Sequence, residues 1–254
     1  QIVDAVIVGN TAMHHLFLGL PVRQLGNAPY LAATSDALDV KARDLGLAFA
    51  PGAYVHLLPN IAGFVGADHV ATILSTGLDQ TDETAIVLDI GTNTEIALHH
   101  QGRIITCSTA SGPAFEGAHI SCGMRAAEGA VERVEISENV VKYQTIDDRP
   151  AVGLCGSGIL DVVAQLYRND ILDMKGGMRE GDARVRSTEG GREFVLVSAA
   201  ESGTGQDIVV SRADVGEIQL AKAAIRAGVN VLLDEAGIGA QDVQRFVVAG
   251  AFGT

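Results

Sequence analysis

The sequence predicts an α/β fold. Short apolar runs rich in Val and Ile, which are typical of buried strands, alternate along the chain with stretches whose apolar residues recur at helical spacing. Most of these runs end at Gly, Asn or Pro, residues that mark tight turns. Of the 254 residues, 47% are hydrophobic and 19% are charged, so the chain has enough apolar surface for a large folded core.

The strands are predicted from apolar runs that stop at turn residues. The most strongly apolar run ends at Ile90, and a Gly-Thr-Asn turn then leads into a returning strand, which indicates a hairpin. A second hairpin is expected in the Val-rich stretch between residues 131 and 146. The expected strands are residues 5–8, 54–58, 84–90, 95–98, 103–106, 131–136, 140–146 and 246–248.

The helices are predicted from apolar residues on one face and from residues that suit a helix start. Thr11 is expected to cap the first helix, and Gly112-Pro113 begins a short one because Pro fits the first helical position. The stretch 19–51 is irregular and is expected to be a surface excursion, and 198–207 a polar loop. The expected helices are residues 12–18 and 64–75, a short helix from 113, a helix from 156, and residues 212–235.

The charge and the cysteines exclude several classes of function. The net charge is −13 and no cluster of Lys and Arg exists, so nucleic acid is not an expected partner. The acidic surface favours solubility, and docking of a basic partner is the alternative. The three cysteines lack the spacing of a disulfide framework or a metal site. The apolar runs are too short to span a bilayer and no signal peptide opens the sequence, so we expect a cytoplasmic protein without membrane contact.

The clearest candidate site is the turn that follows Asp89. An acid at the end of a buried strand precedes Gly91, Thr92, Asn93 and Thr94, and such a turn can present backbone N–H groups and side-chain donors to an anion. Asp89 repels phosphate, but it can hold a hydrated Mg²⁺ that neutralises phosphate charge. A simple hairpin with a hydrogen-bonded Asp is an equally good interpretation of these residues alone.

Three other glycine-rich segments are candidates for ligand contact. The strand ending at Val248 is followed by Gly250, Ala251, Phe252 and Gly253, where a ligand could approach the backbone closely. Helix N-termini, which attract anions, are expected at two places. Taken alone, each segment is explained better by an ordinary turn or helix cap than by ligand contact. The residues at the two helix starts are Gly112 and Glu116, and Gly156 and Ser157.

Common catalytic and metal motifs are missing. The sequence has no P-loop, and Asp161 stands where a dinucleotide fingerprint beginning at Gly156 needs its third glycine. The pairs His14-His15 and His99-His100 are adjacent in sequence, so their side chains point to different faces and neither pair is a natural chelate.

The order of the segments resembles the second half of an actin-like ATPase, the superfamily of acetate and sugar kinases, heat-shock chaperones and actin. The matching segments are residues 89–94, 111–117, the long helix, and 249–253. A closer similarity is to the reductive activators of corrinoid enzymes, and it covers essentially the whole chain. It rests on residues 8–16, 58–68, 114–120, 156–161 and 219–225.

The resemblance implies a fold of two related lobes with ATP between them. Residues 1–80 would form part of the first lobe and a connecting segment, and 81–254 the second lobe. The turn at 89–93 would be the phosphate hairpin, with Mg²⁺ held through water by Asp89, the candidate catalytic residue, and Gly250–Gly253 the adenosine loop.

The family uses ATP to help reduce Co(II) corrinoid to Co(I), with a two-iron two-sulfur cluster in an N-terminal ferredoxin domain. The resemblance therefore implies ATP and Mg²⁺ as cofactors of this chain, a corrinoid protein or corrinoid-dependent methyltransferase as partner, and a homodimer. The ferredoxin cysteines and the first phosphate hairpin are absent from this sequence, which puts ATP hydrolysis by this chain alone in question. The alternatives are a small-molecule kinase of the same fold, for which no general base is evident, and a noncatalytic binding module.

Overall fold

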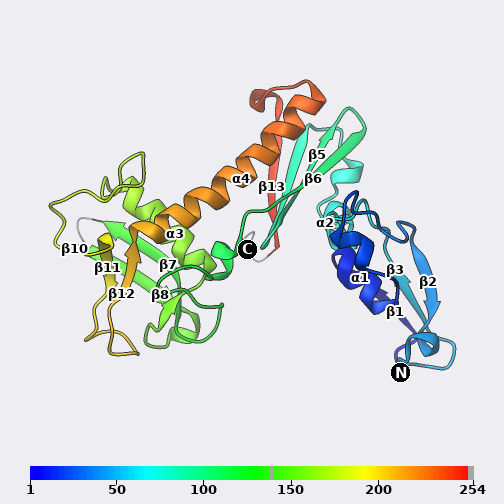
Figure 1. Ribbon diagram of the computed structural model, residues 1–254, viewed down its shortest axis with the longest axis horizontal. Helices are drawn as coiled ribbons and strands as arrows, with labels where there is room; N and C mark the ends of the chain where they lie inside the picture. Colours follow the sequence, from blue (N-terminus) through cyan, green and yellow to red (C-terminus); the bar gives the residue numbers. More distant parts are fainter. Residues whose placement is uncertain (138–139, 251–254) are drawn as a thin grey trace. The chain divides into compact units, whose positions relative to one another are not determined.

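The computed structural model describes residues 1–137 and 140–250 (Figure 1). The chain forms two compact units, and each is described by itself. Unit 1 consists of Gln1–Ile90, Thr94–Thr109 and the residues from Gly228 on, and unit 2 of Gly91–Asn93 and Ala110–Ala227. The long helix α4 (Arg212–Ala236) contributes residues to both units.

The first sheet of unit 1 has three short strands in the order β1-β3-β2. β1 (Asp4–Ile7) runs parallel to β3 (Tyr54–Leu57), and β2 (Leu38–Lys41) is antiparallel to β3. The strands near 5–8 and 54–58 are therefore confirmed. The interpretation of 19–51 as a mere surface excursion was wrong, because β2 lies within it; its four residues were too few to give a clear pattern.

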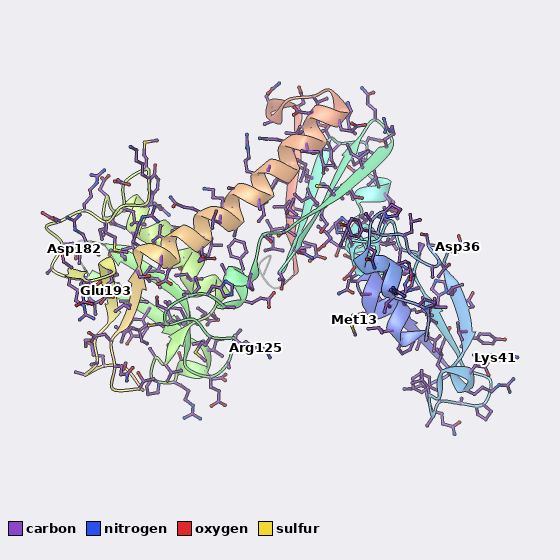
Figure 2. The ribbon with its side chains drawn as sticks, in the orientation of Figure 1. Met13, Asp36, Lys41, Arg125, Asp182 and Glu193 are labelled. Atoms are coloured by element: carbon purple, nitrogen blue, oxygen red, sulfur yellow. The ribbon has the colours of Figure 1, made fainter. Side chains whose placement is uncertain are left out.

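Helix α1 (Thr11–Phe17) follows β1 in unit 1, as predicted, but its cap differs from the prediction. The side chain of Asn10 accepts a hydrogen bond from the amide of Met13, so Asn10 is the capping residue. Thr11 instead donates its hydroxyl proton to the carbonyl of Ala62 at 2.8 Å. Figure 2 shows the side chain of Met13 on this helix, and that side chain is 57% exposed.

The second sheet of unit 1 has the order β13-β4-β5-β6. β4 (Ala85–Ile90), β5 (Thr94–His100) and β6 (Arg103–Thr109) form the predicted antiparallel hairpins, and β13 (Arg245–Ala249) pairs with β4 in parallel.

Two helices cover the two faces of this sheet. Helix α2 (Ala67–Ser75) packs Ile73 against the face that carries Ala85, Val87 and Ala97. On the other face, Gly228 of α4 approaches Ile96 and Cys107 so closely that a Cβ would lie 2.8 Å and 3.3 Å from their side chains. Helix α2 begins three residues later than predicted, because the extended backbone of Gly66 precedes it.

Unit 2 combines two small sheets with helix α3 (Gly156–Arg168). The sheet β8-β7-β9 contains the predicted hairpin of β7 (Ala130–Ser137) and β8 (Val140–Thr145), with β9 (Gly153–Leu154) parallel to β7. The predicted helix from residue 156 is confirmed.

The other sheet of unit 2 was not predicted. It contains β10 (Val185–Thr188), β11 (Gly191–Val197) and β12 (Ile208–Ser211), all antiparallel. Glu193, labelled in Figure 2, pairs with Arg186 across β10 and β11 at 2.7 Å. Arg186 also pairs with Asp207 at 2.6 Å, so polar as well as apolar contacts hold this sheet.

Six short 3₁₀ helices connect these elements within the described residues. They are η1 (Arg23–Gly26), η2 (Ala42–Leu45), η3 (Leu78–Gln80), η4 (Pro113–Glu116), η5 (Ile146–Asp148) and η6 (Ala240–Asp242). The short helix predicted from residue 113 is η4. All three cysteines are free thiols, as expected. Among the helices in residues 1–137 and 140–250, none is both long enough and apolar enough to cross a bilayer.

Candidate functional site

The carboxyl ends of two parallel neighbours, β4 and β13, meet at one edge of the second sheet of unit 1. Their register pairs Ala249 with Asp89, so Gly250 follows directly beside Asp89. Ligands of open α/β sheets bind beyond the carboxyl ends of parallel strands. Gly250 has a φ of +77°, and a Cβ at this position would lie 3.3 Å from Oδ1 of Asp89. A glycine therefore leaves room for a ligand beside this carboxylate oxygen.

The other oxygen of Asp89 is held by helix α2. The hydroxyl of Thr72 donates a hydrogen bond to Oδ2 of Asp89 at 2.9 Å. Thr72 could not be predicted from the sequence, because the two residues are 17 positions apart and the packing of α2 on β4 brings them together. The two oxygens of Asp89 thus have different environments, one fixed by Thr72 and one beside Gly250.

A second acidic side chain, Glu95, lies beside Asp89. Glu95 lies directly opposite Asp89 in the β4–β5 ladder, and the hydroxyl of Ser108 donates to its Oε1 at 3.0 Å. Burial raises the pKa of Glu95; the hydrogen bond from Ser108 opposes this, and the charges of Asp68 and Asp89 add to it. The site is therefore strongly negative, which favours a cation.

His69 lies in the first turn of α2, next to this acidic group. Its side chain is fully buried, and neither ring nitrogen has a hydrogen-bond partner within residues 1–137 and 140–250. Burial lowers the pKa of His69, although the charges of Asp89 and Asp68 oppose this effect. The ring is therefore neutral at neutral pH and does not offset the negative charge.

The position of Glu95 gives a first testable prediction. Because its pKa is raised by burial, the folded state binds the Glu95 proton more tightly than the unfolded state, so the contribution of Glu95 to stability falls as pH rises above 4.5. Glu95→Gln removes the charge opposite Asp89 and should raise the free energy of unfolding at pH 7 by about 0.5 kcal/mol. Thermal unfolding at pH 5 and pH 7 measures this. A variant less stable than the native chain at pH 7 would contradict it.

The turn that joins β4 to β5 belongs to unit 2. Gly91 donates its N–H to the carbonyl of Asn93 at 3.1 Å, so this N–H is used within the turn. The side chains of Thr92 and Asn93 are exposed, and their amide N–H groups donate no hydrogen bond in the described part of the chain. These two amides are the donors that remain for an anion.

The segment before η4 braces this turn. Ser111 donates its hydroxyl proton to the carbonyl of Gly91 at 3.2 Å, and the N–H of Gly112 donates to the carbonyl of Thr92 at 2.9 Å. Gly112 lies at a helix start that was predicted to attract an anion, and its own N–H fixes the turn. Gly112 has a φ of +81°, which suits a glycine at this position.

Glu116 of η4 accepts a hydrogen bond from the hydroxyl of Thr92. Both side chains are exposed, so the structure brings together two of the predicted site residues. A carboxylate repels phosphate, which means that Glu116 can orient Thr92 or accept bonds from hydroxyl groups of a ligand.

The start of α3 is in unit 2 as well. Gly156 is buried, whereas Ser157 is exposed and its hydroxyl lies 3.3 Å from the sulfur of Cys155. Gly158 is a glycine for a packing reason, because a Cβ there would lie 2.0 Å from the carbonyl oxygen of Val131. At the start of α3, Gly158 therefore packs against β7, whereas Ser157 presents an exposed hydroxyl to solvent.

The single carboxylate of Asp89 fits a hydrated Mg²⁺. In the described residues, no group of three or more His, Cys, Asp or Glu side chains is arranged to hold a metal ion. Mg²⁺ keeps several waters and takes only one or two carboxylates when a nucleotide supplies phosphates, which a single partly exposed Asp89 can satisfy. The predicted adenosine-loop residues Ala251, Phe252 and Gly253 lie outside the described residues.

Two family models together match all of the chain except residue 82. The model of the RACo middle region matches residues 1–81, and the model of the C-terminal domain of RACo, the ASKHA domain, matches residues 83–254. ASKHA denotes the actin-like ATPase fold, so the predicted fold is confirmed.

Individual relatives are similar over most of the chain. The corrinoid activation enzyme RamQ of Eubacterium limosum is 39% identical over 100% of this chain and 44% of its own length. A [Co(II) methylated amine-specific corrinoid protein] reductase of Methanosarcina barkeri is 30% identical over 77% of this chain and 37% of its own length.

A solved reductive activator for corrinoid, iron-sulfur protein superposes with a TM-score of 0.87 at 42% identity, over 99% of this chain and 41% of the other. The chain thus spans less than half of each of these relatives.

Proposed function

The chain belongs to the RACo family of reductive activators of corrinoid proteins, and from this premise we propose that it forms the ATP-binding part of such an activator. The full-length protein uses ATP to help reduce Co(II) corrinoid to Co(I) in a corrinoid protein or corrinoid-dependent methyltransferase. The names of the two curated relatives support this reaction. The electron comes from a two-iron two-sulfur cluster of the full-length protein, not from this chain.

One observation carries the assignment of the nucleotide site. The carboxyl ends of β4 and β13 are adjacent, which places a carboxylate, Asp89, beside a glycine, Gly250, where a side chain would crowd it. In our proposal Asp89 holds Mg²⁺ through water, and the amides of Thr92 and Asn93 hold phosphate. The remaining predicted contacts are Gly91, Thr94, Gly112, Glu116, Gly156, Ser157 and Gly250–Gly253.

The residues of this chain act by binding and orienting. ATP with Mg²⁺ supplies the free energy of binding and hydrolysis. Asp89 attracts the cation, and the braced turn from Gly91 to Asn93 fixes the direction of the anion-binding amides. A ligand shifts a conformational equilibrium only through different affinities for the two states. We therefore propose that the state with ATP engages the corrinoid partner differently from the state without it.

We also propose that residues 1–80 form part of the first lobe and a connecting segment, and that 81–254 form the second lobe. The border between the two family matches, at residues 81–83, supports this division.

Gly250→Val in the full-length protein tests the nucleotide site. The added side chain crowds Oδ1 of Asp89, so we expect Mg·ATP binding to weaken at least tenfold by calorimetry, with a parallel loss of ATP-dependent Co(I) formation by visible absorption. Gly46→Val is the matched control. Its φ is +71°, close to the +77° of Gly250, but a Cβ there meets no atom within 4 Å.

The two outcomes that would contradict the proposal are distinct. Normal Mg·ATP binding by Gly250→Val would remove Gly250 from the site. Co(I) formation by the native protein that does not respond to ATP would remove the proposed function.

A further inference from the structure

We propose that Thr72 is a positioning residue that couples helix α2 to the cation at Asp89. The inference rests on the proposed nucleotide site and goes beyond it, because it assigns to α2 the role of sensing whether that site is filled. Helix α2 lies in the part of the chain that matches the middle region, and Asp89 lies in the part that matches the C-terminal domain. Both belong to unit 1.

The hydrogen bond from Thr72 gives the two oxygens of the Asp89 carboxylate different roles. The Thr72 hydroxyl donates to Oδ2 at 2.9 Å, which fixes the plane of the carboxylate, while Oδ1 lies beside Gly250. A carboxylate held by one oxygen presents the other in a defined direction. Thr72 therefore sets the direction in which Asp89 meets a hydrated cation.

In the described part of the chain, no cationic side chain pairs with the Asp89 carboxylate. Within residues 1–137 and 140–250, Asp89 forms no ion pair with Lys, Arg or His, and Glu95 stands opposite it in the ladder. The Thr72 hydroxyl is thus the side-chain donor that stabilises the Asp89 charge before a cation binds. A cation at Oδ1 favours the ionised carboxylate in the orientation that the Thr72 hydrogen bond holds, so the two interactions strengthen each other. By linkage, the hydrogen bond and the cation influence each other equally.

The hydroxyl of Thr72 is separate from the contacts that end the helix. The backbone carbonyl of Thr72, not its hydroxyl, accepts the hydroxyl protons of Ser75 at 3.1 Å and Thr76 at 2.8 Å. Removing the hydroxyl alone therefore leaves the end of α2 intact. This makes a substitution at Thr72 a clean test.

The test compares Thr72→Val, Thr72→Ser and Thr76→Val in the full-length protein. Thr72→Val should raise the Mg²⁺ concentration for half-maximal ATP binding about tenfold, since a hydrogen bond to a charged acceptor is typically worth about one decade. Thr72→Ser keeps the hydroxyl and should restore the native value to within about twofold. Thr76→Val should not change it, because in the described part of the chain the Thr76 hydroxyl donates to backbone carbonyls of α2 alone.

Hydrogen exchange of residues 67–75 measures the coupling without an activity assay. Mg·ATP should change the exchange of these amides in the native protein and in Thr72→Ser, but not in Thr72→Val. Native Mg²⁺ dependence together with a native exchange response in Thr72→Val would overturn the inference. If the native protein itself failed to bind Mg·ATP, the proposed function would fail first, so the two failures are distinguishable.

Discussion

Asp89→Asn should reduce the affinity of the full-length protein for Mg·ATP about a hundredfold. The substitution keeps the size of the side chain but removes its charge. The carboxylate and the cation are separated by one water, or about 6 Å. At an effective dielectric constant of about 20, two opposite unit charges at this separation attract each other by roughly 3 kcal/mol. This energy corresponds to about two decades in affinity. Calorimetry with ATP in the presence of Mg²⁺, and again with EDTA, measures the loss and its dependence on the metal.

Asp79→Asn is the matched control for this experiment. Asp79 is exposed in η3, and its substitution changes the net charge by the same amount. It should leave Mg·ATP binding unchanged. Equal affinities of Asp89→Asn and the native protein would show that this carboxylate does not serve the cation.

The strand ends near the site could be predicted from the sequence, but the side chains that surround Asp89 could not. The apolar run ending at Ile90 and the turn after it were predictable, since a buried strand and a Gly-rich turn leave strong local patterns. Thr72 and Glu95 were not identified as site residues. Thr72 reaches Asp89 only because α2 packs on β4, and Glu95 faces it only through the register of the hairpin. Tertiary packing and register are not local signals.

The missed strands have another cause. β2, β10 and β12 have four residues each, which is only two periods of strand alternation and too few to stand out in the sequence; the seven residues of β11 were missed as well. They are held by their neighbours in the sheet and by ion pairs such as that of Arg186 with Glu193. Context, not propensity, decides the structure of such short segments.

Glycines presented a different difficulty, because a glycine required by packing looks the same in a sequence as one required by a ligand. Gly250 lies beside a carboxylate, whereas Gly158 lies against the backbone of β7. Both were part of segments that resembled ligand-binding loops. The three-dimensional structure distinguishes a glycine required by packing from one required by a ligand, and substitutions can distinguish them by experiment.

Gly158→Ala should destabilise the protein by more than about 3 kcal/mol, because a Cβ 2.0 Å from the carbonyl oxygen of Val131 forces α3 away from β7. Gly216→Ala is the matched substitution, also at a helical glycine of unit 2. Its Cβ would meet only the Arg212 side chain, at 3.5 Å, so it should stabilise α4 by about 0.5–1 kcal/mol. Urea unfolding of both variants measures the difference. Similar stabilities of the two variants would mean that α3 does not pack on β7 at this glycine, and the start of α3 would then be free to serve a ligand alone.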